Sequence, residues 1–179
     1  MNRDYSGFPS TPQDSFDSTT AHEFNHSIQF GYGGLSGANE PDEVFVEGGA
    51  TWMEDEVQHA ADDNRHYLWP DFHDSMGEYN DSPYPYWITF RGLTERYGTG
   101  VAGGAEQVMQ DFWELTSQNA ASNQAALASA LDAAGTTLAD AFHVYAVAVK
   151  FNRACGGGYV YPYCFEEGPG YVSVAGPTP

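Results

Sequence analysis

The sequence predicts a mainly α-helical protein, and three observations support this fold class. Apolar residues recur at the helical spacing of i, i+3, i+4 and i+7 over residues 104–117 and again over 137–149. Residues 123–134 form an alanine-rich stretch that ends at Gly135, a typical helix terminator. Residues 22–26, with the sequence H-E-F-N-H, fit a metal-binding pattern that requires a helix.

The chain is long enough for a single domain with a hydrophobic core. We expect residues 1–16 to form a loop, residues 17–165 to form the helical domain, and residues 166–179 to form a linker-like tail. The tail is rich in Gly and Pro, which interrupt regular structure. Asp17 and Ser18 are suitable N-caps for the first helix, because their side-chain oxygens can accept hydrogen bonds from free backbone N–H groups.

The first helix carries the most informative motif. His22 and His26 are four residues apart, so on a helix they lie within about 40° of each other and about 6 Å apart along the axis. Both rings can then reach one zinc ion at about 2.0–2.1 Å. Glu23 lies about 100° around the helix from His22, where its carboxylate can accept a proton. The motif therefore predicts a zinc site with Glu23 as the catalytic base.

An alternative interpretation concerns the start of this helix. Thr20 and Glu23 fit the S/T-x-x-E capping box, in which Glu23 would close the first turn and would not handle a proton. A longer helix that begins at Asp17 or Ser18 would place the motif in its second turn and leave Glu23 free. The two interpretations differ in where the helix begins.

A second acidic motif follows at residues 42–54, which read D-E-V-F-V-E-G-G-A-T-W-M-E. Together with H-E-x-x-H, this segment resembles the gluzincin family of zinc peptidases, in which a Glu followed by Gly and a small residue is the third zinc ligand. The resemblance implies that Glu47 is this ligand, with Glu43 as the alternative. Gly48 and Gly49 would allow the second helix to approach the metal helix closely.

The resemblance extends to Glu54, which stands seven residues after Glu47 and thus within about 20° of it on a helix. Glu54 matches an acidic position in gluzincins of the aminopeptidase-N type. A carboxylate there can accept the outer N–H of a ligating histidine and fix its tautomer. The alternative is that Glu54 is a solvated charge beside Asp55 and Glu56.

Residues 82–98 read as a turn followed by a helix that ends at Gly98. In gluzincins of the aminopeptidase-N type, a Tyr near the start of such a helix donates its hydroxyl to the oxygen that becomes negative during hydrolysis. The resemblance implies this role for Tyr84 or Tyr86, although both could be ordinary aromatic residues. A histidine is the rival donor, and three candidates recur every seven residues: His59, His66 and His73.

The resemblance covers residues 16–100 and implies a gluzincin-like catalytic helical domain. It departs from the family before the metal helix, where gluzincins have a β-sheet whose edge strand pairs with the substrate. Residues 1–21 alone precede the motif here. We therefore expect most of that sheet to be lacking, with residues 1–16 a loop or a remnant of it.

The composition sets the expected partners and environment. Six basic residues against 25 acidic ones give a formal net charge of −19, and Lys150 is the one lysine. This charge repels nucleic acid phosphates and anionic membrane surfaces, so we expect neither as a partner. It favours halophilic adaptation, since salt screens repulsion between carboxylates. The sequence also lacks the apolar run of about 18 residues that a membrane-spanning helix needs.

Cys155 and Cys164 flank a glycine-rich turn and are the two cysteines of the sequence. We expect a disulfide between them, which would contribute roughly 2–3 kcal/mol by closing a short loop. A four-cysteine metal site is excluded because there is no second pair. Because disulfides persist in oxidising compartments, we expect a secreted protein, although residues 1–5 do not open a signal peptide.

Together, these observations predict a secreted zinc peptidase in which His22, His26 and Glu47 hold Zn²⁺. Its substrates would be peptides or proteins. We favour endopeptidase action, because the sequence shows no motif of the kind that grips a free amino terminus. The alternative is a non-catalytic, zinc-stabilised binding or adhesion domain, which would keep the metal without hydrolysis. In a third interpretation the motif is accidental, and an acidic helical domain binds no zinc.

Overall fold

The structure, a computed structural model of the chain, is mainly helical, as the sequence predicts. It describes residues 5, 8, 10–32, 42–58, 61, 63–68, 82–97, 106–117, 122–156, 162–168 and 171. Over these ranges there is no β-strand, apart from an isolated bridge between Ala154 and Phe165. None of the helices in the described ranges is long and apolar enough to cross a membrane.

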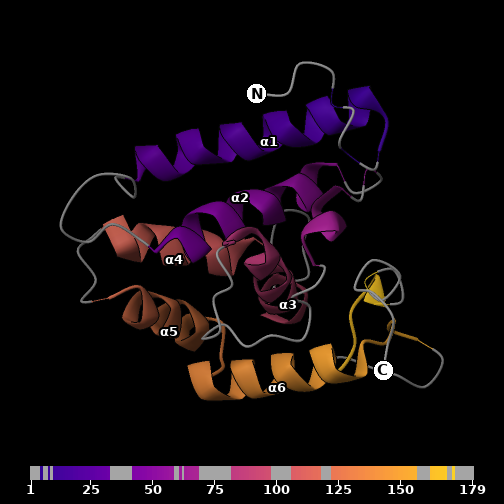
Figure 1. The fold of residues 1–179 in the computed structure, drawn as a ribbon. Coiled ribbons are helices and arrows are strands. Elements are labelled where there is room, and N and C mark those ends of the chain that lie inside the picture. The colour runs from indigo at the N-terminus through magenta and orange to yellow at the C-terminus, as the bar shows by residue number, and fades with distance from the viewer. Residues whose placement is uncertain are drawn as a thin grey trace.

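The described part of the chain consists of six α-helices and two short 3-10 helices. In chain order these are α1 (Pro12–Gly31), α2 (Glu43–Val57), η1 (Asp63–Leu68), η2 (Tyr84–Tyr86), α3 (Trp87–Tyr97), α4 (Gln107–Ser117), α5 (Asn123–Ala133) and α6 (Leu138–Phe151). Figure 1 shows α1 along one side of the molecule and α6 along the opposite side. Between them, α2 packs against α1, against α3 and against both 3-10 helices.

The hydrophobic core lies on the side of α2 that faces away from α1. At its centre the rings of Phe45 and Phe112 stack with centroids 4.7 Å apart, and Phe45 also packs against Phe90 at 5.8 Å. The other large side chains buried in the core include Trp52, Leu68, Trp87, Leu93, Met109, Leu131, Phe165 and Tyr171. Among the buried residues of α1, by contrast, Ala21 alone is apolar. α1 is therefore attached to the domain through a polar face, and this face carries the candidate site.

α1 begins earlier than the sequence suggests. Thr11 is its N-cap, since the threonine hydroxyl accepts a hydrogen bond from the backbone N–H of Asp14 at 3.3 Å. Pro12 occupies the first helical position, where no N–H donor is needed. The expectation that residues 1–16 form a loop is therefore wrong for residues 12–16.

The residues predicted to start this helix lie inside it. Asp17 and Ser18 are not N-caps, and the Thr20 hydroxyl donates to the carbonyl oxygen of Phe16 at 2.7 Å. The capping-box interpretation is thus wrong. Glu23 lies about three turns from the start of α1, where it has no capping role.

The last two helices follow the predicted pattern. Ser122 and Thr137 are the N-caps of α5 and α6. Gly135 follows α5 with a φ of 85°, a left-handed conformation that favours glycine. On α6 the buried face is centred on Ala141 and Ala148, and Leu138, Phe142, Tyr145 and Val149 of the apolar face expected over residues 137–149 pack around them. Ala146, which the same pattern assigned to this face, is exposed.

α4 begins at Gln107 and not at residue 104. Residues 98–105 lie outside the described part of the chain. The predicted apolar stripe is buried where it is described, at Val108, Met109, Phe112, Trp113 and Thr116. The periodicity thus identified the buried face of this helix correctly.

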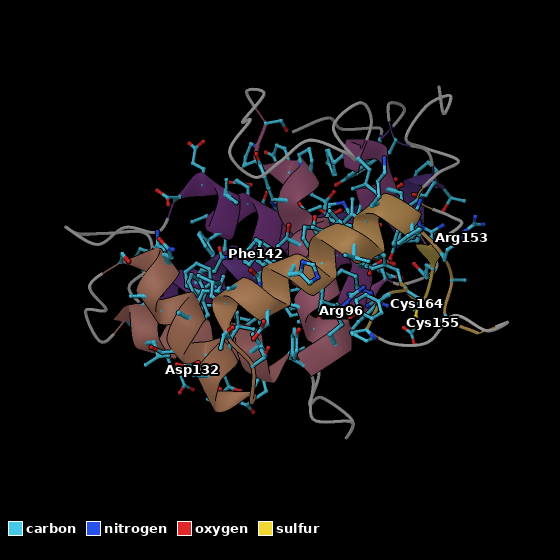
Figure 2. The ribbon with its side chains drawn as sticks, turned by 90° about the horizontal axis from the view of Figure 1, so that it is seen from below. Arg96, Asp132, Phe142, Arg153, Cys155 and Cys164 are labelled. Carbon is cyan, nitrogen blue, oxygen red and sulfur yellow. A yellow bond between two sulfur atoms is a disulfide. The ribbon has the colours of Figure 1, made fainter. Side chains whose placement is uncertain are left out.

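A disulfide loop fastens the C-terminal segment to α3. Cys155 and Cys164 form the predicted disulfide, with Cα atoms 5.1 Å apart, and Figure 2 shows it next to Arg96. The guanidinium of Arg96 donates to the backbone oxygens of Pro162 at 2.6 Å and of Cys164 at 2.8 Å. It also lies over the ring of Phe165, 4.5 Å from the centroid. One arginine of α3 therefore holds both the loop and the residue that follows it.

The prediction of a linker-like tail from residue 166 onward is wrong for its first part. Glu166 accepts a hydrogen bond from Arg91 at 3.0 Å, and the side chain of Tyr171 is fully buried. These contacts make Glu166 and Tyr171 part of the domain. Residues 172–179 lie outside the described part of the chain.

Candidate metal centre

α1 and α2 lie side by side and bring together three side chains that could hold a metal ion. The ligand atoms of His22, His26 and Glu47 all lie within 4.8 Å of one another. Across the described ranges this is the one cluster of its kind, and the alternative ligand Glu43 is not part of it. The set is the one that the H-E-x-x-H motif and the resemblance to gluzincins imply.

The distances from Glu47 to the two histidines are compatible with ligands that share one tetrahedral metal ion. Oε2 of Glu47 is 3.2 Å from Nε2 of His22 and 3.5 Å from Nε2 of His26. Two ligands that are each about 2.0–2.1 Å from a tetrahedral zinc lie about 3.3 Å apart. The side chains of His22, His26 and Glu47 are 10%, 19% and 26% exposed, so the site is open to solvent on one side. Three ligands and an open position are the arrangement of a catalytic zinc site.

Each histidine is oriented by an oxygen next to its outer ring nitrogen. Nδ1 of His22 lies 2.7 Å from Oε1 of Glu54, and Nδ1 of His26 lies 2.8 Å from Oε1 of Gln29. Such acceptors keep a proton on Nδ1 and leave the lone pair of Nε2 free for a metal. Glu54 is buried, so it is not the solvated charge of the alternative interpretation.

Gln29 is a part of the site that the sequence did not reveal. Its side chain is 1% exposed, and its Nε2 donates to the backbone oxygen of Val46 at 2.9 Å. One amide group therefore orients the ring of His26 and also ties α1 to the helix that carries Glu47. The role depends on the position of α2, which the spacing of Gln29 from His26 does not indicate.

The two glycines after Glu47 face different neighbours. A Cβ added at Gly49 would lie 3.4 Å from Nε2 of Gln29 on α1, an ordinary van der Waals distance, so Gly49 faces α1 but the approach of the two helices does not require a glycine there. A Cβ added at Gly48 would lie 3.0 Å from Cε2 of Phe90 and 3.3 Å from Cβ of Tyr86. The prediction that Gly48 makes room for α1 is therefore wrong, because it makes room for η2 and α3.

Without a metal, the carboxylates of the site raise the pKa values of both histidines. Burial alone would lower the pKa of His22, but hydrogen bonds to Glu47 and Glu54 raise it to about 9. The hydrogen bond to Glu47 also raises the pKa of His26, and the two histidines lower the pKa of Glu47 to about 2. Glu54 differs, since its burial raises its pKa despite the contact with His22. A metal ion must displace the proton from His22, so metal affinity should rise with pH.

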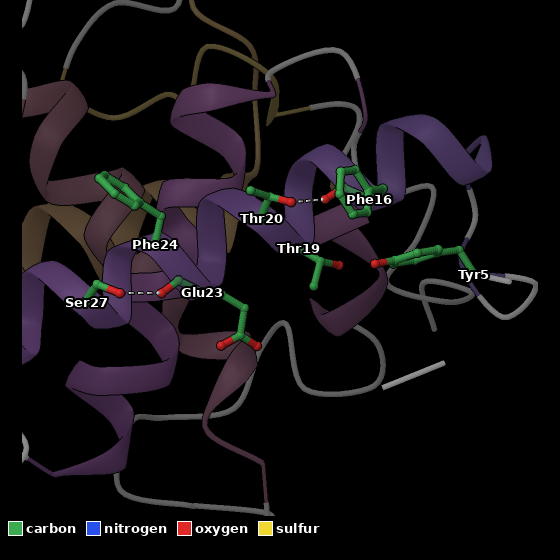
Figure 3. A pocket seen from close by; sticks show the side chains of 7 residues that line it. All are labelled: Tyr5, Phe16, Thr19, Thr20, Glu23, Phe24 and Ser27. Atoms are coloured by element: carbon green, nitrogen blue, oxygen red, sulfur yellow. Dashed lines mark hydrogen bonds between the residues drawn. The ribbon is translucent and has the colours of Figure 1, made fainter. Parts of the chain in front are cut away.

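Glu23 lies beside the cluster without belonging to it. Its side chain is exposed on α1, one residue after His22. Figure 3 shows the carboxylate extending from the helix among residues that line a pocket. Glu23 is neither a ligand nor a helix cap, so its carboxylate is available to accept a proton.

The two candidate tyrosines of η2 have different surroundings. The ring of Tyr84 lies 6.1 Å from that of His22 and stacks on that of Tyr67 at 4.9 Å. Burial and then the charge of nearby carboxylates, first that of Glu47, raise the pKa of Tyr84, so it remains a hydrogen-bond donor at neutral pH. Tyr86 is buried. The structure thus places Tyr84 beside the metal-binding residues and Tyr86 in the core.

Of the three histidines that are rival oxyanion donors, one lies in the described part of the chain. His59 and His73 lie outside the described residues, and His66 lies in η1. Tyr67, which supports the ring of Tyr84, was not predicted, because its contact with η2 joins two short elements that no periodic pattern marks.

Comparisons of the chain with models of protein families, with curated proteins and with solved structures give no match. The chemistry of the site therefore has to follow from its own residues. Two neutral imidazoles and one carboxylate form a donor set that suits zinc, with an open position beside a free carboxylate.

Proposed function

We propose that the protein is a zinc-dependent peptidase. The observation that carries the proposal is the combination of three possible ligand atoms within 4.8 Å of one another with Glu23, a carboxylate on the same helix as the two histidines. The orientation of the two histidines supports the proposal. Glu54 contacts Nδ1 of His22 and Gln29 contacts Nδ1 of His26, which leaves Nε2 of each ring free to bind the metal.

Each residue has a distinct part in this proposal. His22, His26 and Glu47 would hold zinc, which when bound lowers the pKa of a water and polarises a carbonyl. Glu23 would accept a proton as the water oxygen bonds to the peptide carbonyl carbon, and would deliver it to the amine nitrogen as the C–N bond breaks. Tyr84 would donate a hydrogen bond to the carbonyl oxygen as that oxygen becomes negative.

The location of Tyr84 supports its part in the reaction. Its ring lies 6.1 Å from that of His22, and burial together with the charges of nearby carboxylates, Glu47 and Glu23 among them, raises the pKa of its hydroxyl. The disulfide between Cys155 and Cys164 fits a protein that works outside the cytosol, where such bonds persist. We therefore propose secretion together with peptidase activity.

The test compares three zinc-loaded proteins on a library of quenched-fluorescence peptides at high salt. Wild type should cleave, Glu23→Gln should lose about 10²–10⁴-fold in kcat, and both should bind one zinc. Asp17→Asn is the matched control, because it removes one negative charge from the same helix and should retain activity. Mass spectrometry of the products would show whether cleavage is internal or begins at an end.

The other outcomes have separate meanings. A silent wild type that binds one zinc would support the non-catalytic, zinc-stabilised domain. A protein that binds no zinc would contradict both functions, and equal activity of wild type and Glu23→Gln would contradict the assigned base.

A further inference from the structure

A pocket opens on the outer face of α1, directly beside Glu23. Its volume is about 380 Å³, near the lower end of the range for small-ligand sites. Figure 3 shows that it is formed by one face of α1 together with Tyr5 from the preceding segment. The rings of Phe16 and Phe24 line it, and these two rings are 50% and 65% exposed.

The lining of this pocket combines the rings of Tyr5, Phe16 and Phe24 with the carboxylate of Glu23 and the hydroxyls of Tyr5, Thr19, Thr20 and Ser27. The hydroxyl of Thr20 donates to the backbone oxygen of Phe16 at 2.7 Å, and that of Ser27 donates to the backbone oxygen of Glu23 at 3.4 Å. Both hydroxyls are thereby directed at the helix backbone, as the dashed lines in Figure 3 mark. The carboxylate of Glu23 remains as the charged group of the pocket. The exposed rings of Phe16 and Phe24 nevertheless make the lining mostly apolar, which suits an uncharged, apolar side chain.

Single apolar side chains are common on protein surfaces, but a contiguous group of them marks a surface where another molecule binds. Four of the exposed large apolar residues lie on α1, namely Phe16, Phe24, Ile28 and Phe30. A second copy of the chain is disfavoured as the occupant, because each copy has a formal net charge of −19 and α1 itself carries Asp14, Asp17 and Glu23. The pocket is instead lined by Glu23, the residue that follows the metal-cluster residue His22 on α1 and that is proposed as the catalytic base, so a side chain bound in the pocket would lie next to that base.

We propose that this pocket is a substrate subsite, which takes an aromatic or large aliphatic side chain next to the bond that is cleaved. The proposal rests on the proposed peptidase function and adds a substrate class to it. A side chain in the pocket would cover the rings of Phe16 and Phe24, while its backbone stays near Glu23. Aromatic side chains would also gain ring contacts with these two residues and with Tyr5.

The first experiment measures binding without catalysis. Zinc-loaded protein labelled with ¹⁵N is titrated at high salt with N-acetyl-phenylalanine amide, and with N-acetyl-alanine amide as the reference probe. The phenylalanine probe should shift the amide signals of Thr20, Glu23 and Phe24, and the alanine probe should not. Phe24→Ala should abolish the shifts, whereas Phe30→Ala should keep them. Phe30 is 64% exposed on the same helix and does not line the pocket.

The second experiment measures cleavage preference with the same three proteins. Wild type and Phe30→Ala should prefer Phe, Tyr or Leu over Ala at one position next to the cleaved bond by about tenfold or more, and Phe24→Ala should lose most of this preference. Melting temperatures check that the variants remain folded, which is expected because both rings are exposed.

The results separate the subsite from the peptidase. Cleavage without an apolar preference, or an equal loss in both variants, would overturn the subsite and leave the peptidase standing. A wild type that cleaves nothing overturns the peptidase, and the subsite falls with it even if the phenylalanine amide binds. A dimer that Phe24→Ala dissociates, with an unchanged cleavage preference, would show that a second copy covers this face.

Discussion

α2 holds its acidic side chains in two contrasting ways. On the face toward α1, Glu47 and Glu54 pair with His22 at 3.2 and 2.7 Å. Asp55 and Glu56 follow Glu54 directly, so the helix turns them about 100° and 200° away from it. Both contact Arg91 of α3, at 3.3 Å from Asp55 and 2.8 Å from Glu56. The same type of residue thus meets histidine on one face and arginine on the other.

His22 and Arg91, the partners of these carboxylates, differ in whether a metal ion can take over their positive charge. The charge of a histidine comes from a proton, which a metal ion can displace, whereas a guanidinium in a protein stays charged. Arg91 also binds Glu95 at 2.8 Å and Glu166 at 3.0 Å, so it serves four carboxylates. The α1 face is therefore an exchangeable site, and the α3 face is a permanent connection among α2, α3 and the C-terminal segment.

The largest effect should come from breaking the permanent connection. Arg91→Met would leave Asp55 and Glu95, whose side chains are 1% and 4% exposed, without their cation. Removing one partner of a buried ion pair costs about 3–5 kcal/mol of unfolding free energy. Urea denaturation of the metal-free protein measures this. Lys150→Met removes a positive charge from an exposed position and should cost less than about 0.5 kcal/mol. A similar loss in both variants would contradict the special role of Arg91.

Breaking the exchangeable site should affect metal affinity more than folding. Glu47→Gln removes a ligand, so zinc affinity should fall by more than about 100-fold, the upper end for a residue that only orients a ligand. Competition with a chromophoric chelator measures the affinity. Glu56→Gln makes the same change on the Arg91 face and should leave it unaltered. Zinc should also raise the melting temperature of wild type and not that of Glu47→Gln.

A smaller effect on zinc affinity is expected from the amide that orients His26. Gln29→Leu should lower the affinity about 10–100-fold, because nothing then holds the proton on Nδ1 of His26. Gln29→Glu keeps an acceptor for His26 but loses the donor to the backbone oxygen of Val46. The Glu variant should therefore bind zinc more tightly than the Leu variant. Equal affinities of wild type and Gln29→Leu would show that the amide only fills space.

The smallest expected effect is a pH dependence of the unfolding free energy that arises from the buried acids beside Arg91. Burial raises the pKa of Asp55 to about 6 and that of Glu95 to about 7, although Arg91 opposes both shifts. Between the ordinary pKa of each acid and these values, the folded state keeps protons that the unfolded state has lost. The unfolding free energy of the metal-free protein should therefore decrease as pH rises from about 4 to 7.

Asp55→Asn isolates one part of this pH dependence. The variant cannot lose a proton at this position, so its stability relative to wild type should improve as pH rises from about 4 to 6 and then stay constant. Thermal denaturation at a series of pH values, with zinc removed by a chelator, measures the difference. A constant difference across this range would show that Asp55 is already ionised at low pH.

The sequence predicted those parts of the molecule that depend on local spacing. The four-residue spacing of His22 and His26, and the stripe of α4, place side chains relative to their own helix, and a periodic pattern contains that information. The start of α1 was missed because several suitable caps compete within a few residues, and Thr11 followed by proline has no feature that excludes Asp17.

The parts that were missed depend on contacts between elements. Gln29 acquires its role from a carbonyl on α2, and Arg91 from carboxylates as far along the chain as Glu166. A glycine- and proline-rich tail does not indicate that it carries an ion-pair partner. The family resemblance supplied Glu47 and Glu54, which spacing from the first motif alone would not identify.

The opposite positions of α1 and α6 have a practical consequence. Lys150, the single lysine of the sequence, lies exposed near the end of α6, on the side of the molecule away from α1 (Figure 1). Of the side chains, that of Lys150 alone carries a primary amine, so an amine-reactive fluorophore or sensor surface would attach there when the N-terminal α-amine is blocked. The protein would then be tethered through α6, with the metal centre and the aromatic face of α1 directed toward the solution.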